Sequence, residues 1–178
     1  MILITTKFKD LLIVKHKVYK DRRGSLRVTH NNKKIKTKFI YEYCTTSKKN
    51  SLRGFHFQLK FQQAKYVTVL KGKIFDVAVD VRKNSETFGR YYSCILSDKN
   101  AKSIYIPEGF AHGFYTLDDD NIVIYACTKY RNKNSEISII YNDNDLNIKW
   151  PIKSKKVIIS KKDSNAMTFS EFKKKNEI

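Results

Sequence analysis

Short runs of alternating apolar and polar residues recur along this chain and are separated by turn signals. Runs rich in β-branched and aromatic residues cover positions 2–4, 11–19, 26–29, 39–45, 51–58, 64–70, 74–82, 88–96, 101–106, 111–117, 121–127 and 135–141. Many short strands at regular spacing are typical of an all-β sandwich or barrel. We predict two packed antiparallel sheets in a jelly roll, a double-stranded β-helix whose open end is a natural ligand mouth.

The connections and the C-terminal region complete this prediction. Residues 64–70 and 74–82 are joined by a short turn at Gly72, and two β-branched runs about such a turn predict a hairpin. The four runs between residues 88 and 127 are expected to continue it as a meander. Residues 163–175 predict a short helix on the outside, so the chain ends in short helical segments.

The composition adds a strong positive charge. With 36 Lys+Arg against 17 Asp+Glu, the net charge is +19, which suggests nucleic-acid binding. The excess is mostly lysine, often beside asparagine and spread over predicted loops, and none of the usual nucleic-acid motifs is present. We therefore expect no nucleic-acid partner and keep a basic binding module as an alternative. The field can help recruit an anionic small molecule.

Three cysteines, Cys44, Cys94 and Cys127, show no paired spacing, which fits a reducing compartment better than a secreted scaffold. The N-terminal apolar run is too short for a signal peptide, and no apolar run approaches the length of a membrane span. With no composition break or internal repeat, residues 1–178 are expected to form a single domain. We expect a cytoplasmic protein without a membrane partner.

The segment Ser51–Gln58 combines a cation and an imidazole in an apolar, alternating run. In a strand, Arg53 and Phe55 point to one face, and His56 and Gln58 point to the other. A histidine and a glutamine on an inner face are costly unless something there uses them. A lone histidine is more often a satisfied core residue, so the rest of the chain has to decide between the two interpretations.

Other side chains could join this segment in a site. Lys65 begins the next predicted strand, His112 lies at a turn-to-strand junction, and Tyr125 interrupts an apolar run. Asp76 and Asp80 alternate with valines in a strand. Each alone has a structural explanation: a strand-edge lysine, a turn-capping histidine, a core tyrosine or a carboxylate paired with surface lysines. Inward-facing aspartates in so apolar a strand are harder to explain in that way.

The spacing Pro-x-Gly-x-x-His, ending at His112, is also the second half of a cupin metal motif. The first half requires His-x-His followed by a glutamate, but here Gln58 follows His56, and no glutamate lies between Gln58 and Asp80. Two histidines without a third ligand match a 2-His-1-carboxylate centre poorly. We predict no metal site and keep a metal-dependent cupin enzyme as an alternative.

Taken together, these segments resemble the dTDP-4-dehydrorhamnose 3,5-epimerase family of sugar-nucleotide epimerases. The resemblance rests on Ser51–Gln58, Lys71–Lys83, Ser85–Gly89, Ile106–Phe114 and Asn142–Pro151, and extends more weakly to Asp21–Gly24 and Ser160–Asp163. It implies a cupin-like fold, no cofactor, and a homodimer that exchanges an N-terminal strand.

The resemblance also implies a reaction, in rhamnose-type deoxysugar biosynthesis for surface polysaccharides. The substrate is a nucleotide-linked 4-keto-6-deoxy sugar, with dTDP as the expected nucleotide, in which the ketone acidifies the hydrogens on carbons 3 and 5. A base removes one hydrogen, an enolate forms, and an acid returns a proton to the opposite face. By similarity, the catalytic residues are His56 as base, Asp163 as its hydrogen-bond partner, Lys65 as enolate stabiliser and Tyr125 as acid.

The substrate-binding set implied in the same way comprises Arg23 and Arg53 on the diphosphate, with Gln58, His112, Asp76 and Tyr19. Strict alternation turns Arg53 and His56 to opposite sides, so either a bulge near Gly54 unites them or Arg53 has another role.

The nucleotide end departs from the family pattern. Val28 stands where the family has a glutamate, and Tyr41 and Tyr43 replace a glutamine and an asparagine. The base is therefore either thymine stacked on tyrosines or another base. An epimerase that inverts only one carbon, on a GDP- or CDP-sugar, remains an alternative.

Overall fold

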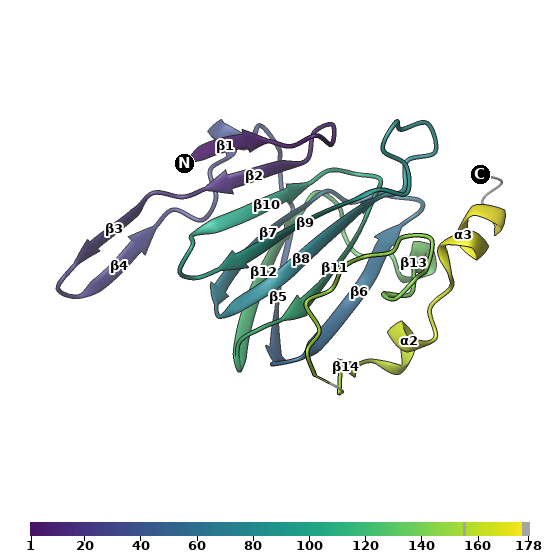
Figure 1. Ribbon diagram of the computed structural model, residues 1–178. Helices are drawn as coiled ribbons and strands as arrows, with labels where there is room; N and C mark the ends of the chain where they lie inside the picture. Colours follow the sequence, from purple (N-terminus) through teal and green to yellow (C-terminus); the bar gives the residue numbers. More distant parts are fainter. Residues whose placement is uncertain (155, 176–178) are drawn as a thin grey trace.

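Two antiparallel β-sheets packed face to face form the body of the computed structural model, which describes residues 1–154 and 156–175 (Figure 1). In spatial order, the first sheet consists of β1 (Ile2–Thr5), β2 (Leu12–Lys15), β10 (Lys102–Ile106), β7 (Lys65–Lys71), β12 (Asp120–Cys127) and β5 (Tyr41–Lys48). The second consists of β13 (Glu136–Ser138), β6 (Ser51–Gln58), β11 (Phe110–Thr116), β8 (Lys73–Asp80) and β9 (Tyr91–Ser97). The predicted all-β jelly roll is confirmed.

Gly72 marks a difference from the sequence-based prediction. β7 and β8 lie in different sheets, so the predicted hairpin is wrong. Gly72 has a φ of +84°, and a Cβ there would collide with the carbonyl oxygen of Asp120, so glycine suits this corner. The predicted meander is also wrong, because the successive strands β9, β10, β11 and β12 alternate between the two sheets.

Both faces of the second sheet are covered. Its inner face shares the core between the sheets with side chains such as Val67 and Phe114. Its outer face packs against the C-terminal segment, where Phe169 and Phe172 join a second buried cluster that includes Phe57. The predicted C-terminal helix is two short helices, α2 (Lys161–Ser164) and α3 (Phe169–Lys175). None of the helices in the described ranges is long and apolar enough to cross a membrane.

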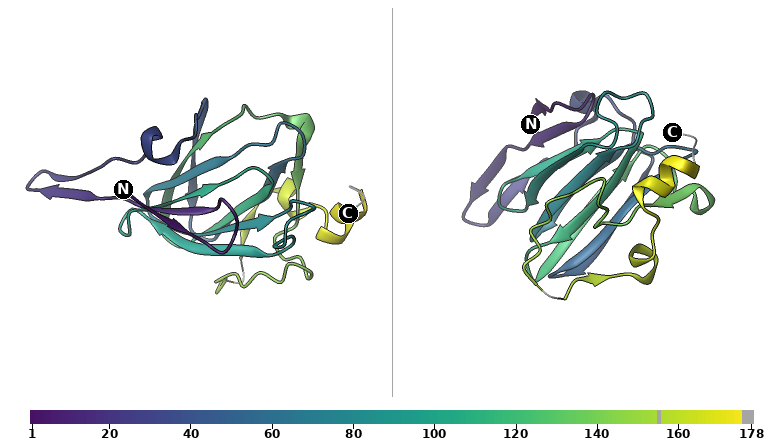
Figure 2. Two further views of the ribbon diagram at one scale, coloured as in Figure 1. Left: turned by 90° about the horizontal axis from the view of Figure 1, so that it is seen from above. Right: turned by 45° about the vertical axis from the view of Figure 1, so that its right-hand side comes forward.

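A two-stranded hairpin, β3 (Val18–Asp21) and β4 (Gly24–Arg27), projects from the sheets (Figure 2). The single strand predicted for residues 11–19 breaks at His16, which is buried and bonded to the carbonyl oxygen of Val28 at 2.8 Å and to Ser103 Oγ at 2.7 Å. Within the described residues, the other helical turns are α1 (Asn32–Ile35) and the 3-10 helix η1 (Lys133–Ser135).

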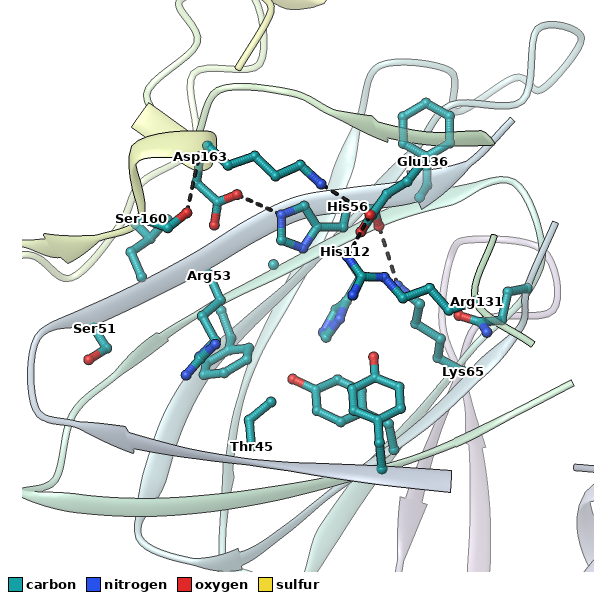
Figure 3. A pocket seen from close by; sticks show the side chains of 18 of the residues that line it. Thr45, Ser51, Arg53, His56, Lys65, His112, Arg131, Glu136, Ser160 and Asp163 are labelled. Atoms are coloured by element: carbon teal, nitrogen blue, oxygen red, sulfur yellow. Dashed lines mark hydrogen bonds and ion pairs between the residues drawn. The ribbon is translucent and has the colours of Figure 1, made fainter. Parts of the chain in front are cut away.

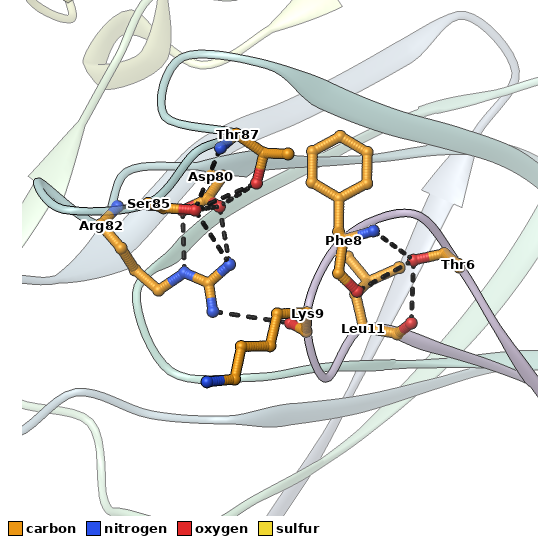
Figure 4. A network of polar contacts seen from close by, with 8 residues as sticks. All are labelled: Thr6, Phe8, Lys9, Leu11, Asp80, Arg82, Ser85 and Thr87. Atoms are coloured by element: carbon orange, nitrogen blue, oxygen red, sulfur yellow. Dashed lines mark hydrogen bonds and ion pairs between the residues drawn. The ribbon is translucent and has the colours of Figure 1, made fainter.

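Asp80 organises the loop that follows β8 (Figure 4). Its carboxylate is buried and accepts hydrogen bonds from Arg82, Ser85 and Thr87, of which Ser85 Oγ and Thr87 Oγ1 each lie 2.6 Å from Oδ2. Burial opposes ionisation, but these donors together hold the pKa of Asp80 below its ordinary value. Asp80 therefore acts as a structural anchor for this loop.

Candidate active site

A cavity of about 610 Å³ lies between the two sheets (Figure 3). Side chains from β5, β7 and β12 line it on one side, and side chains from β6 and β11 line it on the other. The segment that runs through β14 (Ile158–Ile159) into α2 adds a further wall. Seven predicted site residues line it: Arg53, His56, Gln58, Lys65, His112, Tyr125 and Asp163.

A bulge in β6 brings Arg53 and His56 to the same cavity. His56 pairs with His112 and Arg53 pairs with Phe114, so Gly113 alone faces two residues of β6. Gly54 has a φ of +112°, and a Cβ there would lie 2.6 Å from Gly113 Cα. Glycine is needed where the backbones approach so closely. In a regular strand, the alternation of side chains would turn Arg53 and His56 to opposite faces. The extra residue of the bulge turns both to the same face.

His56 is held by Asp163 at the cavity wall. β14 pairs in parallel with β6, and α2 follows directly, with Ser160 Oγ capping it by accepting from the Asp163 N–H at 3.1 Å. Asp163 Oδ1 lies 2.7 Å from His56 Nε2, and Oδ2 accepts from the Gly54 N–H at 3.2 Å. An Asp163 carboxylate that accepts from Nε2–H leaves Nδ1 of the neutral ring with the lone pair of a base.

With His56 as the base that the family resemblance implies, replacing Asp163 with asparagine is expected to lower kcat by roughly 10²–10⁴-fold, because the amide no longer selects the tautomer of His56 that keeps a lone pair on Nδ1. Burial raises the pKa of Asp163, but bonds from His56 and Gly54 outweigh it and hold the pKa below its ordinary value. Such a carboxylate stabilises the fold above the unfolded-state pKa of about 3.9, and that stability is lost as the pH falls through the folded-state value.

Urea denaturation at neutral and acidic pH checks the expected pH dependence of the stability that Asp163 contributes. The stability gap between wild type and Asp163→Asn should narrow as the pH falls below about 4. Asp145→Asn, at an exposed carboxylate paired with Lys173 at 3.4 Å, is the matched control and should leave kcat unchanged. A gap that stays constant with pH would contradict the assigned role.

Lys65 and Tyr125 face the cavity from the first sheet. Lys65 is 9% exposed, and its Nζ donates to the carbonyl oxygen of His56 at 3.4 Å. Burial lowers the pKa of Lys65. Tyr125 stacks on Tyr43 with ring centroids 4.6 Å apart, and burial raises its pKa well above the ordinary value. Tyr125 therefore keeps its proton, while Lys65 loses its charge more readily than an exposed lysine.

His112 and Asp76 form a second imidazole–carboxylate pair. His112 Nε2 lies 2.8 Å from Asp76 Oδ2, and both side chains are buried. The His112 ring meets Tyr125 at a centroid distance of 5.9 Å. Asp76 does not line the cavity itself, and its carboxylate contacts the cavity residue His112.

Besides Asp76, two predicted substrate-binding residues lie outside the cavity, and a third lines it with its amide already bonded. Arg23 and Tyr19 lie on the projecting hairpin β3–β4 and do not line the cavity of their own chain, and Arg23 pairs with Asp21 at 2.7 Å. Gln58 lines the cavity, but its amide is bonded to backbone groups of Phe61, Tyr130 and Asn132. A local sequence pattern does not show which polar side chains already have hydrogen-bond partners within the chain.

Arg53 lines the cavity while its guanidinium is anchored at the cavity edge. Its Nε donates to Ser47 Oγ at 3.0 Å, and Nη2 donates to the carbonyl oxygen of Thr46 at 3.1 Å. The side chain is exposed, which leaves it accessible to an anion.

Sequence reasoning missed Arg131, Glu136 and Lys162, which also line the cavity. Glu136 Oε2 lies 2.7 Å from Arg131 Nη2 and 3.1 Å from Lys162 Nζ. These charges stand among many similar lysine-rich stretches. The pairing of β13 with β6 brings Glu136 to the site, and the pairing of β14 with β6 places α2, which carries Lys162, beside it.

The fold and the cavity define a cupin-like enzyme whose site sets a histidine–carboxylate pair opposite a lysine and a tyrosine. Residues 5–171 match the family model described as dTDP-4-dehydrorhamnose 3,5-epimerase. The chain belongs to the dTDP-4-dehydrorhamnose 3,5-epimerase family and is an isomerase of the epimerase class.

Relatives and solved structures agree. The chain is 42% identical over 173 residues to the dTDP-4-dehydrorhamnose 3,5-epimerase of Salmonella typhimurium (93% of this chain, 94% of the relative). It is 40% identical over 168 residues to that of Methanothermobacter thermautotrophicus (91% of each chain). Its fold matches the dTDP-6-deoxy-D-glucose-3,5-epimerase of Legionella pneumophila, solved in complex with dTDP-4-keto-L-rhamnose, with a TM-score of 0.91, 39% identity, and 94% and 92% of the two chains covered.

Proposed function

We propose that this enzyme epimerises carbons 3 and 5 of a dTDP-linked 4-keto-6-deoxy sugar. The observation that carries the proposal is the opposition of His56, on one sheet, and Tyr125, on the other, across one cavity. A base and an acid on opposite walls can remove a proton from one face of a sugar ring and return a proton to the other. The dTDP-sugar bound to the Legionella relative supports the choice of substrate.

In the proposed mechanism, Nδ1 of His56 removes the proton next to the ketone. The C–H electrons form a carbon–carbon double bond, and the carbonyl electrons move to the oxygen on carbon 4. The ammonium of Lys65 stabilises this enolate oxygen. When the carbonyl re-forms, the carbon takes a proton from the Tyr125 hydroxyl on the opposite face. The proposal requires neither a metal nor an organic cofactor.

The substrate's diphosphate is assigned to Arg53, because a guanidinium matches phosphate oxygens well. Arg23 and Tyr19 would reach the cavity of a second copy, which makes a homodimer part of the proposal. The projecting hairpin that carries them supports this arrangement (Figure 2). Ile2, Leu3 and Ile4, all exposed on the edge strand β1, are a further reason to pair.

Incubating the purified enzyme with dTDP-4-keto-6-deoxyglucose in D2O tests the function. We expect deuterium at carbons 3 and 5, with and without prior treatment with a chelator, and calorimetric binding of dTDP in preference to GDP, CDP and UDP. Exchange at one carbon would make the chain a single-carbon epimerase, and loss of exchange after chelation would favour a metal-dependent cupin enzyme. No exchange and no dTDP binding would reject the proposal.

A further inference from the structure

The cavity wall beside Lys65 carries a guanidinium that the proposed mechanism does not use. Arg131 follows β12 and lines the cavity together with Tyr41, Tyr43 and Lys65. In Figure 3, Arg131 and Arg53 lie on opposite sides of His56. The cavity therefore offers a cation on each side of the proposed base, and the diphosphate accounts for one of them.

Gln58 fixes the backbone on both sides of Arg131. Its Nε2 donates to the carbonyl oxygen of Tyr130 at 3.4 Å, and its Oε1 accepts from the N–H of Asn132 at 2.7 Å. Nε2 also donates to the carbonyl oxygen of Phe61 at 2.7 Å, which holds the amide itself. Gln58 is 6% exposed, and such bonds are strong where water is excluded. The loop thus presents Arg131 from a defined position.

Glu136 in turn holds the side chain of Arg131. Arg131 Nη2 donates to Glu136 Oε2 at 2.7 Å, and Lys162 Nζ lies 3.1 Å from the same oxygen. The Glu136 side chain is 12% exposed, while that of Arg131 is 52% exposed. Two cations that share one carboxylate leave net positive charge. A guanidinium has five N–H donors, so one bond to Glu136 does not exhaust it.

We propose that Arg131 binds the sugar ring of the substrate, through a hydroxyl or keto oxygen on the side turned away from the diphosphate, and that Gln58 and Glu136 are positioning residues for it. This rests on the proposed function, in which Arg53 takes the diphosphate and Lys65 takes the oxygen on carbon 4. A guanidinium only donates hydrogen bonds, so its partner is an oxygen acceptor such as those a sugar carries.

Calorimetry with two ligands separates the sugar from the nucleotide. Arg131→Gln is expected to weaken binding of dTDP-glucose about 10-fold or more, the effect of one hydrogen bond to a charged group, and to leave binding of dTDP unchanged. Lys133→Gln, an exposed cation in the same loop, is the matched control and should change neither. An equal loss for both ligands, or no loss for either, would overturn the proposal. Failure of the wild type to bind dTDP would instead reject the proposed function.

The positioning role of Glu136 has its own readout. Glu136→Gln should weaken dTDP-glucose binding without affecting dTDP, and adding it to Arg131→Gln should cause no further loss, because both changes remove the same contact. Losses that add, or a loss of dTDP binding, would overturn the role of Glu136. The melting temperature of each variant should equal that of the wild type, which shows that the binding measurements compare folded proteins.

Discussion

Replacing His56 with alanine is expected to abolish deuterium incorporation into the 4-keto sugar, with kcat for epimerisation lowered by at least about 10²–10⁴-fold. The effect is large because Nδ1 of His56 is the proposed base and because Asp163 fixes its tautomer through the 2.7 Å contact to Nε2. Loss of this one side chain therefore removes the step that starts the reaction. Mass spectrometry of the sugar nucleotide after incubation in D2O measures it directly.

The matched comparison is Tyr125→Phe, which removes only the proposed acid. Deuterium exchange on the face of the sugar ring next to His56 should persist in part, because the base is intact. Inversion should be lost, because no proton reaches the opposite face of the ring. Full exchange in His56→Ala would reject the assignment of the base. Unchanged inversion in Tyr125→Phe would remove Tyr125 as the acid.

Replacing Lys65 with methionine is expected to lower kcat by about 10²–10³-fold, the usual cost of losing one group aimed at a developing oxyanion. Folding should not suffer, because an apolar side chain of similar length replaces a buried ammonium that is costly to desolvate. Steady-state kinetics and urea denaturation together separate these effects. Lys71→Met, at the exposed end of the same strand, should leave kcat unchanged.

The pH profile identifies Lys65 independently. Burial lowers its pKa, so its charge and the rate should be lost at a lower pH than for an exposed lysine, which titrates at about 10.4. Tyr125 does not contribute there, because burial raises its pKa well above the ordinary value. The Lys65→Arg variant should keep its positive charge at high pH, so the alkaline limb of its pH–rate profile should move to higher pH. An alkaline limb that is identical in wild type and Lys65→Arg would contradict this role.

The pairing of the strands illustrates what a local pattern leaves open. The runs on either side of Gly72 are strands, as predicted, yet they belong to different sheets. A glycine turn between two β-branched runs suits a hairpin and a corner equally well. The choice depends on the contact of the turn with Asp120 and Asn121, about fifty positions along the chain, and no local rule includes such a contact.

The candidate active site likewise shows what the sequence can predict and what only the fold decides. The resemblance to the family implied His56, Lys65, Tyr125 and Asp163 as the catalytic residues, and the cavity unites all four. The resemblance also implied Gln58 as a substrate ligand, although its amide is bonded to the loop around Arg131. The sequence alone could not separate these cases, since it does not show which polar groups the fold already satisfies.

The sequence by itself determined the all-β class, because alternation is a local property, and its resemblance to the family supplied the proposed catalytic residues. Only the tertiary structure decided to which sheet each strand belongs. It also decided that the bulge at Gly54 turns Arg53 and His56 to the same cavity, and that Arg131 lines this cavity. Each of these depends on a contact between distant segments, where close backbone approach or a shared buried hydrogen bond selects one arrangement among several that are locally equivalent.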